Sequence, residues 1–191
     1  MTQKLAILGS TRGSNLQFIL EAIAGQILDA RVEVVVSNRA DAYILERARQ
    51  HGIPHHHVPV NGQSREAYDR QVQQILSHYT IDLILMIGYM RIASAWFVAQ
   101  WPRKILNIHP SLLPKHAGLM DLAVHQAVLD AGDTETGCTV HFVEPIVDGG
   151  EIVLQRACAV GPADTVTSLK QKVQHLEQAA LLDSIKMTRR H

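Results

Sequence analysis

Asn107, His109 and Asp148 are three residues whose side chains could together transfer an acyl group to an amine. Asn107 and His109 stand in Asn107-Ile108-His109-Pro110-Ser111, where an apolar run ends, and Asp148 stands in Val147-Asp148-Gly149-Gly150. Acyl transfer needs a donor for the developing oxyanion, a group that gains and loses a proton, and an anion that orients that group. An amide, an imidazole and a carboxylate supply these functions, so we predict an active site here.

The same residues also fit a structural interpretation, because Asn107 and Ile108 could simply end a strand and a His-Pro pair is common in loops. Covalent catalysis is not indicated. Cys138 and Cys158 lie outside the signature, and Ser111 lacks the strand-turn-helix context of a nucleophilic serine. The chemistry requires no metal.

The segment at residues 107–114 resembles the signature of the folate-dependent formyltransferases, and Val147-Asp148-Gly149-Gly150 resembles the second signature of that family. The resemblance extends from Gly13 to Glu177. It implies the formyltransferase fold, 10-formyltetrahydrofolate as co-substrate, and catalytic roles for Asn107, His109 and Asp148. Within the family it favours members that formylate the amine of 5-phosphoribosylglycinamide in de novo purine biosynthesis, which gives formylglycinamide ribonucleotide and tetrahydrofolate.

A candidate phosphate site lies in Thr11-Arg12-Gly13-Ser14-Asn15, which opens a predicted helix. The free N–H groups and positive dipole at a helix N-terminus favour an anion, but the same turn often only caps a helix. Neither the dinucleotide fingerprint nor the P-loop fingerprint is present. Many relatives have Gly in place of Thr11. The resemblance implies that phosphoribosylglycinamide is bound by Gly13, Ser14, Asn15 and Glu177.

The folate pocket is implied by the resemblance alone, although a narrow apolar slot with a few polar groups suits a flat heterocycle. Read without the family, Arg65 could decorate the outside of a helix, and residues 90–92 could begin one. The resemblance assigns folate binding to Arg65, Met90, Arg91, Ile92, Ala93, Asn107, Glu144, Pro145, Ile146, Val147 and Asp148.

Apolar runs alternate with amphipathic patterns along the first half of the chain. We predict strands at residues 5–8, 32–36, 55–60 and 83–87, and helices at residues 41–50, at residues 66–77 and after a cap at Ser14 or Asn15. This alternation predicts a Rossmann-like, doubly wound parallel sheet that binds ligands at the carboxyl ends of its strands. The second half predicts antiparallel strands at residues 138–143 and 152–155 and a long helix at residues 166–187.

The composition fits one α/β formyltransferase domain that covers residues 1–191, with 47% hydrophobic content. Lys plus Arg equals Asp plus Glu at 18 each, so the net charge recommends neither nucleic acid nor a membrane as partner. We expect small-molecule substrates and a monomer or homodimer. The cysteine usage and an N-terminus without a signal peptide favour the cytoplasm.

Two histidine-containing segments need separate interpretation. His55-His56-His57 does not predict a metal site, because neighbouring side chains of an extended segment point to opposite faces. Gly118-Leu119-Met120-Asp121-Leu122-Ala123-Val124-His125 reads as a loop about three residues longer than the Gly-Leu-His-Thr-His stretch of many relatives. Met120 replaces the first of those histidines, and His125 corresponds to the second.

Other functions compete with the favoured one. The formyl group could go to another amine, such as a sugar nucleotide or methionyl-tRNA, or the formyl-folate could be hydrolysed. The resemblance associates these activities with additional domains, which we do not expect here. A non-catalytic module that binds a nucleotide or folate is the alternative outside the enzymes, and the presence of all three chemical groups counts against it, although fold alone does not decide function.

Overall fold

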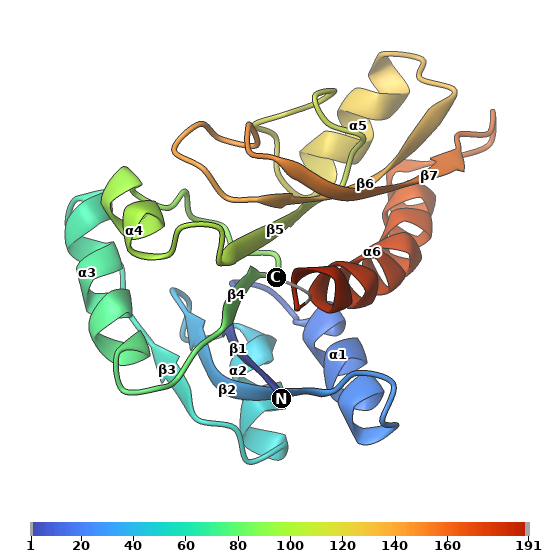
Figure 1. Ribbon diagram of the computed structural model, residues 1–191. Helices are drawn as coiled ribbons and strands as arrows, with labels where there is room; N and C mark the ends of the chain where they lie inside the picture. Colours follow the sequence, from blue (N-terminus) through green and yellow to red (C-terminus); the bar gives the residue numbers. More distant parts are fainter. Residues whose placement is uncertain (1, 190–191) are drawn as a thin grey trace. The chain divides into compact units, whose positions relative to one another are not determined.

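The computed structural model describes residues 2–189 as an α/β protein (Figure 1). The chain forms two compact units, Met1–Leu106 and Asn107–His191. The fifth strand, β5 (Ile105–His109), begins in the first unit and ends in the second. The predicted fold class, with a parallel first half and antiparallel strands and a long helix in the second, is confirmed. The prediction of a single domain stays a prediction.

The first unit has the alternating order of strands and helices that the sequence predicts. Strand β1 pairs in parallel with β2 and with β4, and β2 pairs in parallel with β3. Parallel neighbours need crossover connections, and the helices supply them. Its elements are β1 (Gln3–Leu8), α1 (Ser14–Ala24), β2 (Ala30–Ser37), α2 (Tyr43–Gln50), β3 (His55–His57), α3 (Arg65–Leu76), β4 (Leu83–Met86) and α4 (Ala95–Gln100).

The central strands of this unit are buried along most of their length. All four residues of β4 are buried, as expected for a strand covered on both faces, and so are most residues of β1 and β2. Helix α3 begins where the Ser64 hydroxyl accepts a hydrogen bond from the Ala67 N–H at 3.2 Å, and Ser94 caps α4 in the same way. The carboxyl ends of β1 and β4 lead into the loops that carry the predicted substrate residues.

The second unit contains α5 (Leu122–Asp130), β6 (Glu135–Phe142), β7 (Ile152–Ala159) and α6 (Val166–Thr188). Strands β6 and β7 pair antiparallel, with an irregularity after Val140, and helix α6 packs on both. A capping box between Thr165 and Ser168 fixes the start of α6. The side chains of β6 are buried from Thr136 to Phe142, so this strand can present polar groups to an enclosed site.

Several predicted boundaries differ from the structure. The third strand ends at His57 because residues 58–60 leave the ladder, and α2 begins at Tyr43 rather than at residue 41. Residues 90–92 do not begin a helix; α4 starts at Ala95, after its cap. Helix α5 was not expected, and it includes residues 122–125 of the segment predicted to be a loop.

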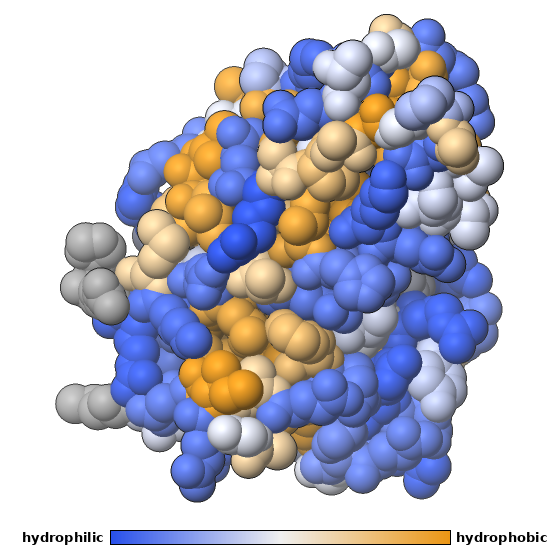
Figure 2. All heavy atoms as spheres, turned by 90° about the vertical axis from the view of Figure 1, so that its right-hand side faces the viewer, coloured by the Kyte–Doolittle hydropathy of each residue, from blue (hydrophilic) through white to orange (hydrophobic). Residues whose placement is uncertain are grey.

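Figure 2 shows hydrophobic side chains in separate patches among hydrophilic ones on the face that it draws. No helix within residues 2–189 is both long and apolar enough to cross a bilayer.

Close approach of β6 and β7 requires a glycine at residue 137. A Cβ atom there would lie 1.9 Å from the carbonyl oxygen of Arg156 on the partner strand. We expect Gly137→Ala to lower the free energy of unfolding by about 1–3 kcal/mol, because the strands must separate to admit the methyl group. The measurement is denaturant unfolding. Gly161→Ala is the matched control: its nearest neighbour would lie at 3.6 Å, so it should be nearly neutral. Equal effects at the two sites would contradict the steric explanation.

Candidate active site

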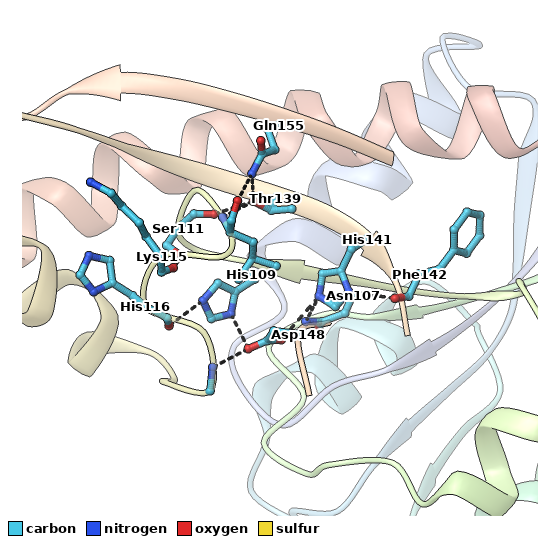
Figure 3. Close-up of polar contacts among 12 residues, drawn as sticks. Asn107, His109, Ser111, Lys115, His116, Thr139, His141, Phe142, Asp148 and Gln155 are labelled. Carbon is cyan, nitrogen blue, oxygen red and sulfur yellow. Dashed lines mark hydrogen bonds and ion pairs between the residues drawn. The ribbon is translucent and has the colours of Figure 1, made fainter. Parts of the chain in front are cut away.

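The second unit brings together all three predicted catalytic side chains (Figure 3). Asn107 and His109 lie two residues apart at the end of β5, so their side chains project from the same side of the strand. Asp148 lies in the loop that connects β6 and β7. Its Oδ2 atom is 3.3 Å from Nδ1 of His109, and both side chains are nearly buried. The predicted imidazole and carboxylate therefore form a pair.

The backbone of the loop at residues 148–150 explains the Asp-Gly-Gly sequence. Asp148 has a left-handed backbone with φ of 52°, which Asp tolerates better than most residues. Gly150 packs so closely that a Cβ atom would lie 1.8 Å from the carbonyl oxygen of Phe142. The Gly118 N–H donates to Oδ2 of Asp148 at 2.8 Å. Together these features aim the carboxylate at His109.

His141 on β6 links Asn107 to the carboxylate. Its Nδ1 faces the carbonyl oxygen of Phe142 at 2.9 Å and must therefore carry a proton. In the neutral ring Nε2 then accepts from the Asn107 amide at 3.1 Å. The same Nε2 lies 3.5 Å from Oδ1 of Asp148. Donation to His141 uses one N–H of the Asn107 amide group, and the second remains for an oxyanion.

Side chains of β6 and β7 fix the loop that follows β5. The Thr139 hydroxyl donates to the Ser111 carbonyl at 2.7 Å and accepts from the Leu113 N–H at 3.0 Å. Gln155 donates both to this hydroxyl at 2.8 Å and to the Leu113 carbonyl at 3.0 Å. The Ser111 hydroxyl donates to the Lys115 carbonyl at 2.6 Å. Ser111 thus has a structural role here, in agreement with the prediction that it is not a nucleophile.

The far end of this loop supplies a second partner for His109. The His109 Nε2 atom lies 3.2 Å from the carbonyl oxygen of His116. The His116 ring and Lys115 both contact the carboxylate of Asp133, each at 2.7 Å. Asp133 therefore anchors the peptide segment whose carbonyl faces the His109 ring.

Both ring nitrogens of His109 face acceptors, and only the imidazolium can donate to both. Burial acts in the opposite direction and lowers the pKa of His109, and the Asp148 carboxylate and the His116 carbonyl reduce this effect without overcoming it. We expected Asp148 to favour the charged ring. The carboxylate does act in that direction, but burial outweighs it, so the net pKa of His109 lies below its ordinary value.

The carboxyl group of Asp148 is shifted in the direction that keeps it ionised. Burial raises the pKa of Asp148, but the neighbouring His141 side chain, the hydrogen bond from the Gly118 N–H and the nearby His109 give a net pKa below the ordinary value. The site thus combines a carboxylate with an imidazole that can take up or release a proton.

His125 lies on α5 rather than in a loop, and only 2% of it is exposed. Burial and then Lys170 lower the pKa of His125. Its Nδ1 atom has no hydrogen-bond partner within residues 2–189. Asp121, just before the helix, has φ of 50° and pairs with Lys170 of α6 at 2.7 Å. The unusual segment after Gly118 is therefore partly a helix held against α6.

The predicted phosphate residues form the start of α1 in the first unit. Gly13 is the N-cap residue, with φ of 69°, and no side chain caps the helix, so the prediction of a cap at Ser14 or Asn15 is wrong. A Cβ atom at Gly13 would lie 2.5 Å from Ile44 of α2. Thr11 contacts Gly88, where a Cβ atom would lie 2.6 Å from its hydroxyl oxygen. This contact and the Gly13 turn fix the backbone around Arg12.

The predicted folate residues lie in both units, and each group is described by itself. In the first unit, Arg65 and Met90 are exposed, and Arg91, Ile92 and Ala93 are partly buried. The guanidinium of Arg91 lies 3.9 Å from the centroid of the Tyr68 ring. In the second unit, Asn107 and Asp148 have the contacts given above, and the exposed residues are Glu144, Pro145, Ile146 and Val147.

Glu177 is not the solvated helix residue that its position alone suggests. It lies partly buried on α6, which packs against β6. Burial, followed by the charge of Glu177, raises the pKa of Cys138 on β6 to about 12. A raised pKa disfavours the thiolate form of Cys138.

The family profile described as Formyl transferase matches residues 3–185. The chain belongs to the formyl transferase family. The phosphoribosylglycinamide formyltransferase of Escherichia coli (strain K12) is 42% identical over 176 residues, covering 92% of this chain and 82% of that protein. The resemblance found in the two signatures is confirmed.

A solved structure and a longer relative agree with this membership. The crystal structure of glycinamide ribonucleotide transformylase 1 from Symbiobacterium toebii has a TM-score of 0.91 and 39% identity, covering 96% of this chain and 86% of that chain. The trifunctional purine biosynthetic protein adenosine-3 of Bos taurus is 41% identical over 178 residues, and the match spans 17% of that protein.

Sequence reasoning about this formyltransferase missed His141, His116 and Asp133. His141 had a readable signal, because it and Thr139 are polar residues at alternate positions of the otherwise apolar run at residues 138–143 and must share one face. His116 and Asp133 had none, since they meet through the fold of the loop and α5. Within residues 2–189 no group of three His, Cys, Asp or Glu side chains is arranged to hold a metal ion.

Removal of the Asp148 charge should lower the pKa of His109 further, because the carboxylate raises it in the native protein. We expect the ring of His109 in Asp148→Asn to stay neutral to lower pH than in the wild type, as measured by NMR titration. Turnover should then depend more strongly on acid pH, with incomplete recovery below the lowered pKa. Asp130→Asn is the control, since Asp130 accepts a hydrogen bond from Gln126 of its own helix instead. An unchanged His109 titration in Asp148→Asn would contradict this electrostatic role.

Proposed function

We propose that this chain transfers the formyl group of 10-formyltetrahydrofolate to the amine of 5-phosphoribosylglycinamide. The products are formylglycinamide ribonucleotide and tetrahydrofolate. The observation that carries the proposal is the linked set of Asp148, His109, His141 and Asn107 in a chain of the formyl transferase family. This set has the donor, the proton carrier and the anion that acyl transfer to an amine needs.

The reaction begins when the substrate amine attacks the formyl carbon and a C–N bond forms. The carbonyl oxygen gains negative charge, and the free N–H of the Asn107 amide and an N–H of His109 stabilise it. The bond between the formyl carbon and N10 of the folate then breaks. The amine loses one proton and N10 gains one, so the net reaction needs a proton path but no oxidant or reductant.

Asp148 and His109 provide that path. His109 acts in its protonated form: the substrate oxygen replaces the His116 carbonyl as the acceptor for the Nε2 proton, and the low pKa of the ring lets it release a proton afterwards. Protonation becomes more favourable as negative charge develops beside it, and Asp148 stabilises the imidazolium from 3.3 Å. A water ordered by the carboxylate completes the transfer to N10. The proposal includes no metal.

The binding roles of the other residues come from the family resemblance. Gly13, Ser14 and Asn15 would hold the ribose phosphate through the start of α1, which is favourable for an anion. Glu177 would hold the ribose hydroxyls or the glycinamide. The folate would be held by Arg65, by residues 90–93, by residues 144–148 and by Asn107. The enzyme would act in the cytoplasm as a monomer or homodimer.

An assay of tetrahydrofolate formation with and without phosphoribosylglycinamide tests the proposal. We expect product only when both substrates are present. Product without the amine would indicate hydrolysis, and activity only with another amine would indicate a different acceptor. Binding of folate without product in any of these assays would indicate a non-catalytic module.

His109→Ala should lower turnover by about 100-fold to 10,000-fold, because the ring acts mainly in the transition state. Tetrahydrofolate binding should remain close to that of the wild type. The two measurements are the steady-state kcat and the titration of the product folate. His175→Ala is the control, because His175 is an exposed histidine of the same unit whose ring faces the Gln171 carbonyl of its own helix. Near-normal kcat in a folded His109→Ala protein would refute the mechanism.

Ser14→Asp should weaken phosphoribosylglycinamide and leave tetrahydrofolate binding unchanged. The added carboxylate would repel the substrate phosphate at short range, yet it should not harm the helix, since a negative charge in the first turn suits the dipole. Calorimetric titration of each ligand separates the two effects. Thr165→Asp places the same charge at the start of α6 and is the matched control. If Ser14→Asp weakened the folate and spared the amine substrate, the division of binding roles would be wrong.

A further inference from the structure

Residues 90–93 form a loop without regular structure, and we call them the 90–93 loop. A loop that binds a heterocycle partly through its backbone must hold those backbone atoms in place before the ligand arrives. In this protein the backbone N–H groups at the two ends of the loop, those of Met90 and Ser94, are each held by a buried polar side chain.

Ser10 holds the first end. Its side chain is 2% exposed, and its hydroxyl oxygen accepts a hydrogen bond from the Met90 N–H at 2.8 Å. The hydroxyl proton is donated to Oδ1 of Asn38 at 2.5 Å, which turns the lone pairs of the oxygen toward Met90. The backbone N–H of Ser10 donates to the Gly88 carbonyl at 3.1 Å. One serine thus ties together the segments that follow β1, β2 and β4.

Asp69 of α3 holds the second end. Its side chain is 3% exposed, and its Oδ2 atom accepts from the Ser94 N–H at 2.6 Å. The Ser94 hydroxyl in turn accepts from the Phe97 N–H at 3.2 Å, so the same residue begins α4. Burial raises the pKa of Asp69, although the hydrogen bond from Ser94 and the nearby Arg91 oppose this effect.

The interior of the loop is fixed from the same helix. Tyr68, the neighbour of Asp69, is fully buried, and the Arg91 guanidinium lies over its ring at 3.9 Å from the centroid. The 90–93 loop is therefore restrained at residue 90 by Ser10, at residue 91 by Tyr68 and at residue 94 by Asp69.

Burying a carboxylate is costly unless it is paired, and buried polar groups can often be replaced by apolar ones without loss of stability. The hydrogen bond that the structure gives to the Asp69 side chain goes to the end of the 90–93 loop. The Ser10 hydroxyl oxygen likewise accepts its hydrogen bond from the Met90 N–H, at the other end of the loop. These contacts define a backbone conformation more than they strengthen the core.

We propose that Ser10 and Asp69 are positioning residues that set the affinity of this protein for folate by fixing the backbone of the 90–93 loop. The proposal rests on the function proposed above. Neither residue touches the reacting atoms in this account. Loss of either one would release one end of the loop, and the ligand would then have to order it on binding.

The test is titration of tetrahydrofolate into the full-length wild type and the variants Ser10→Ala, Asp69→Ala and Asp69→Asn. We expect the Kd to rise about tenfold in Ser10→Ala and in Asp69→Ala, because each leaves a backbone N–H without its acceptor. Asp69→Asn keeps an oxygen that can accept from Ser94, so it should recover most of the affinity. The Kd of phosphoribosylglycinamide should stay unchanged in both Asp69 variants, and kcat at saturating folate should change less than about threefold.

Two control variants remove the same chemistry elsewhere in the first unit. Asp82→Ala removes a carboxylate that accepts from the Lys4 N–H at 2.8 Å, before β4. Ser77→Ala removes a hydroxyl that donates to the Gln74 carbonyl at 2.7 Å at the end of α3. Neither should alter the Kd of tetrahydrofolate.

The outcomes separate the two proposals. A wild-type protein that does not bind tetrahydrofolate would overturn the proposed function and this inference with it. A wild type that binds, with Ser10→Ala and Asp69→Ala binding equally well, would overturn the inference alone. A parallel loss of affinity for both substrates in Asp69→Ala, without recovery in Asp69→Asn, would show a general structural role and would also overturn it. If Ser10→Ala does not fold, Asn38→Ala, which removes the partner of the hydroxyl proton, replaces it.

Discussion

The second unit depends on the need to satisfy one nearly buried carboxylate. The Asp148 side chain is 9% exposed, and a charge in that position must be met by donors. The groups that surround it come from three places: His109 at the end of β5, His141 on β6, and the backbone N–H of Gly118, which donates a hydrogen bond to it. Each must lie close to the carboxylate, so the carboxylate sets the relation among these elements of the unit.

Side chains of β6 and β7 hold the loop after β5, and the end of this loop contacts the His109 ring. The Thr139 hydroxyl donates to the Ser111 carbonyl and accepts from the Leu113 N–H and from the Gln155 amide. Asp133 then fixes His116, whose carbonyl faces Nε2 of His109. The ring therefore has an acceptor on each side, which favours the charged form, within surroundings that disfavour charge. This opposition leaves the ring able to change its protonation when charge develops nearby.

The sequence was sufficient for the parts of this structure that are local. The alternation of apolar runs and amphipathic patterns predicts the parallel first unit, and Asn107-Ile108-His109 and Asp148-Gly149-Gly150 predict the catalytic pair, because turn chemistry and strand ends are visible in short segments. The sequence was insufficient for features that depend on contacts between residues far apart in the chain. Helix α5 is weakly amphipathic and follows an unusual backbone at Asp121, and His116 and Asp133 meet only after folding. The prediction of a cap at Ser14 or Asn15 was wrong for another reason, because Gly13 occupies the N-cap position in a left-handed conformation.

The two units also differ in how a ligand would be recognised, and this difference explains the unequal strength of their sequence motifs. In the second unit the chemistry belongs to side chains, so residue types are specified and the signatures are easy to recognise. In the first unit the proposed binding groups are largely backbone N–H groups at the start of α1 and in the 90–93 loop. A backbone group can be presented by many sequences, provided that glycines such as Gly13 and buried anchors such as Ser10 and Asp69 hold its path. Motifs of this kind look weak in a sequence because part of the specificity lies in buried anchors such as Ser10 and Asp69, which lie outside the loops proposed to bind.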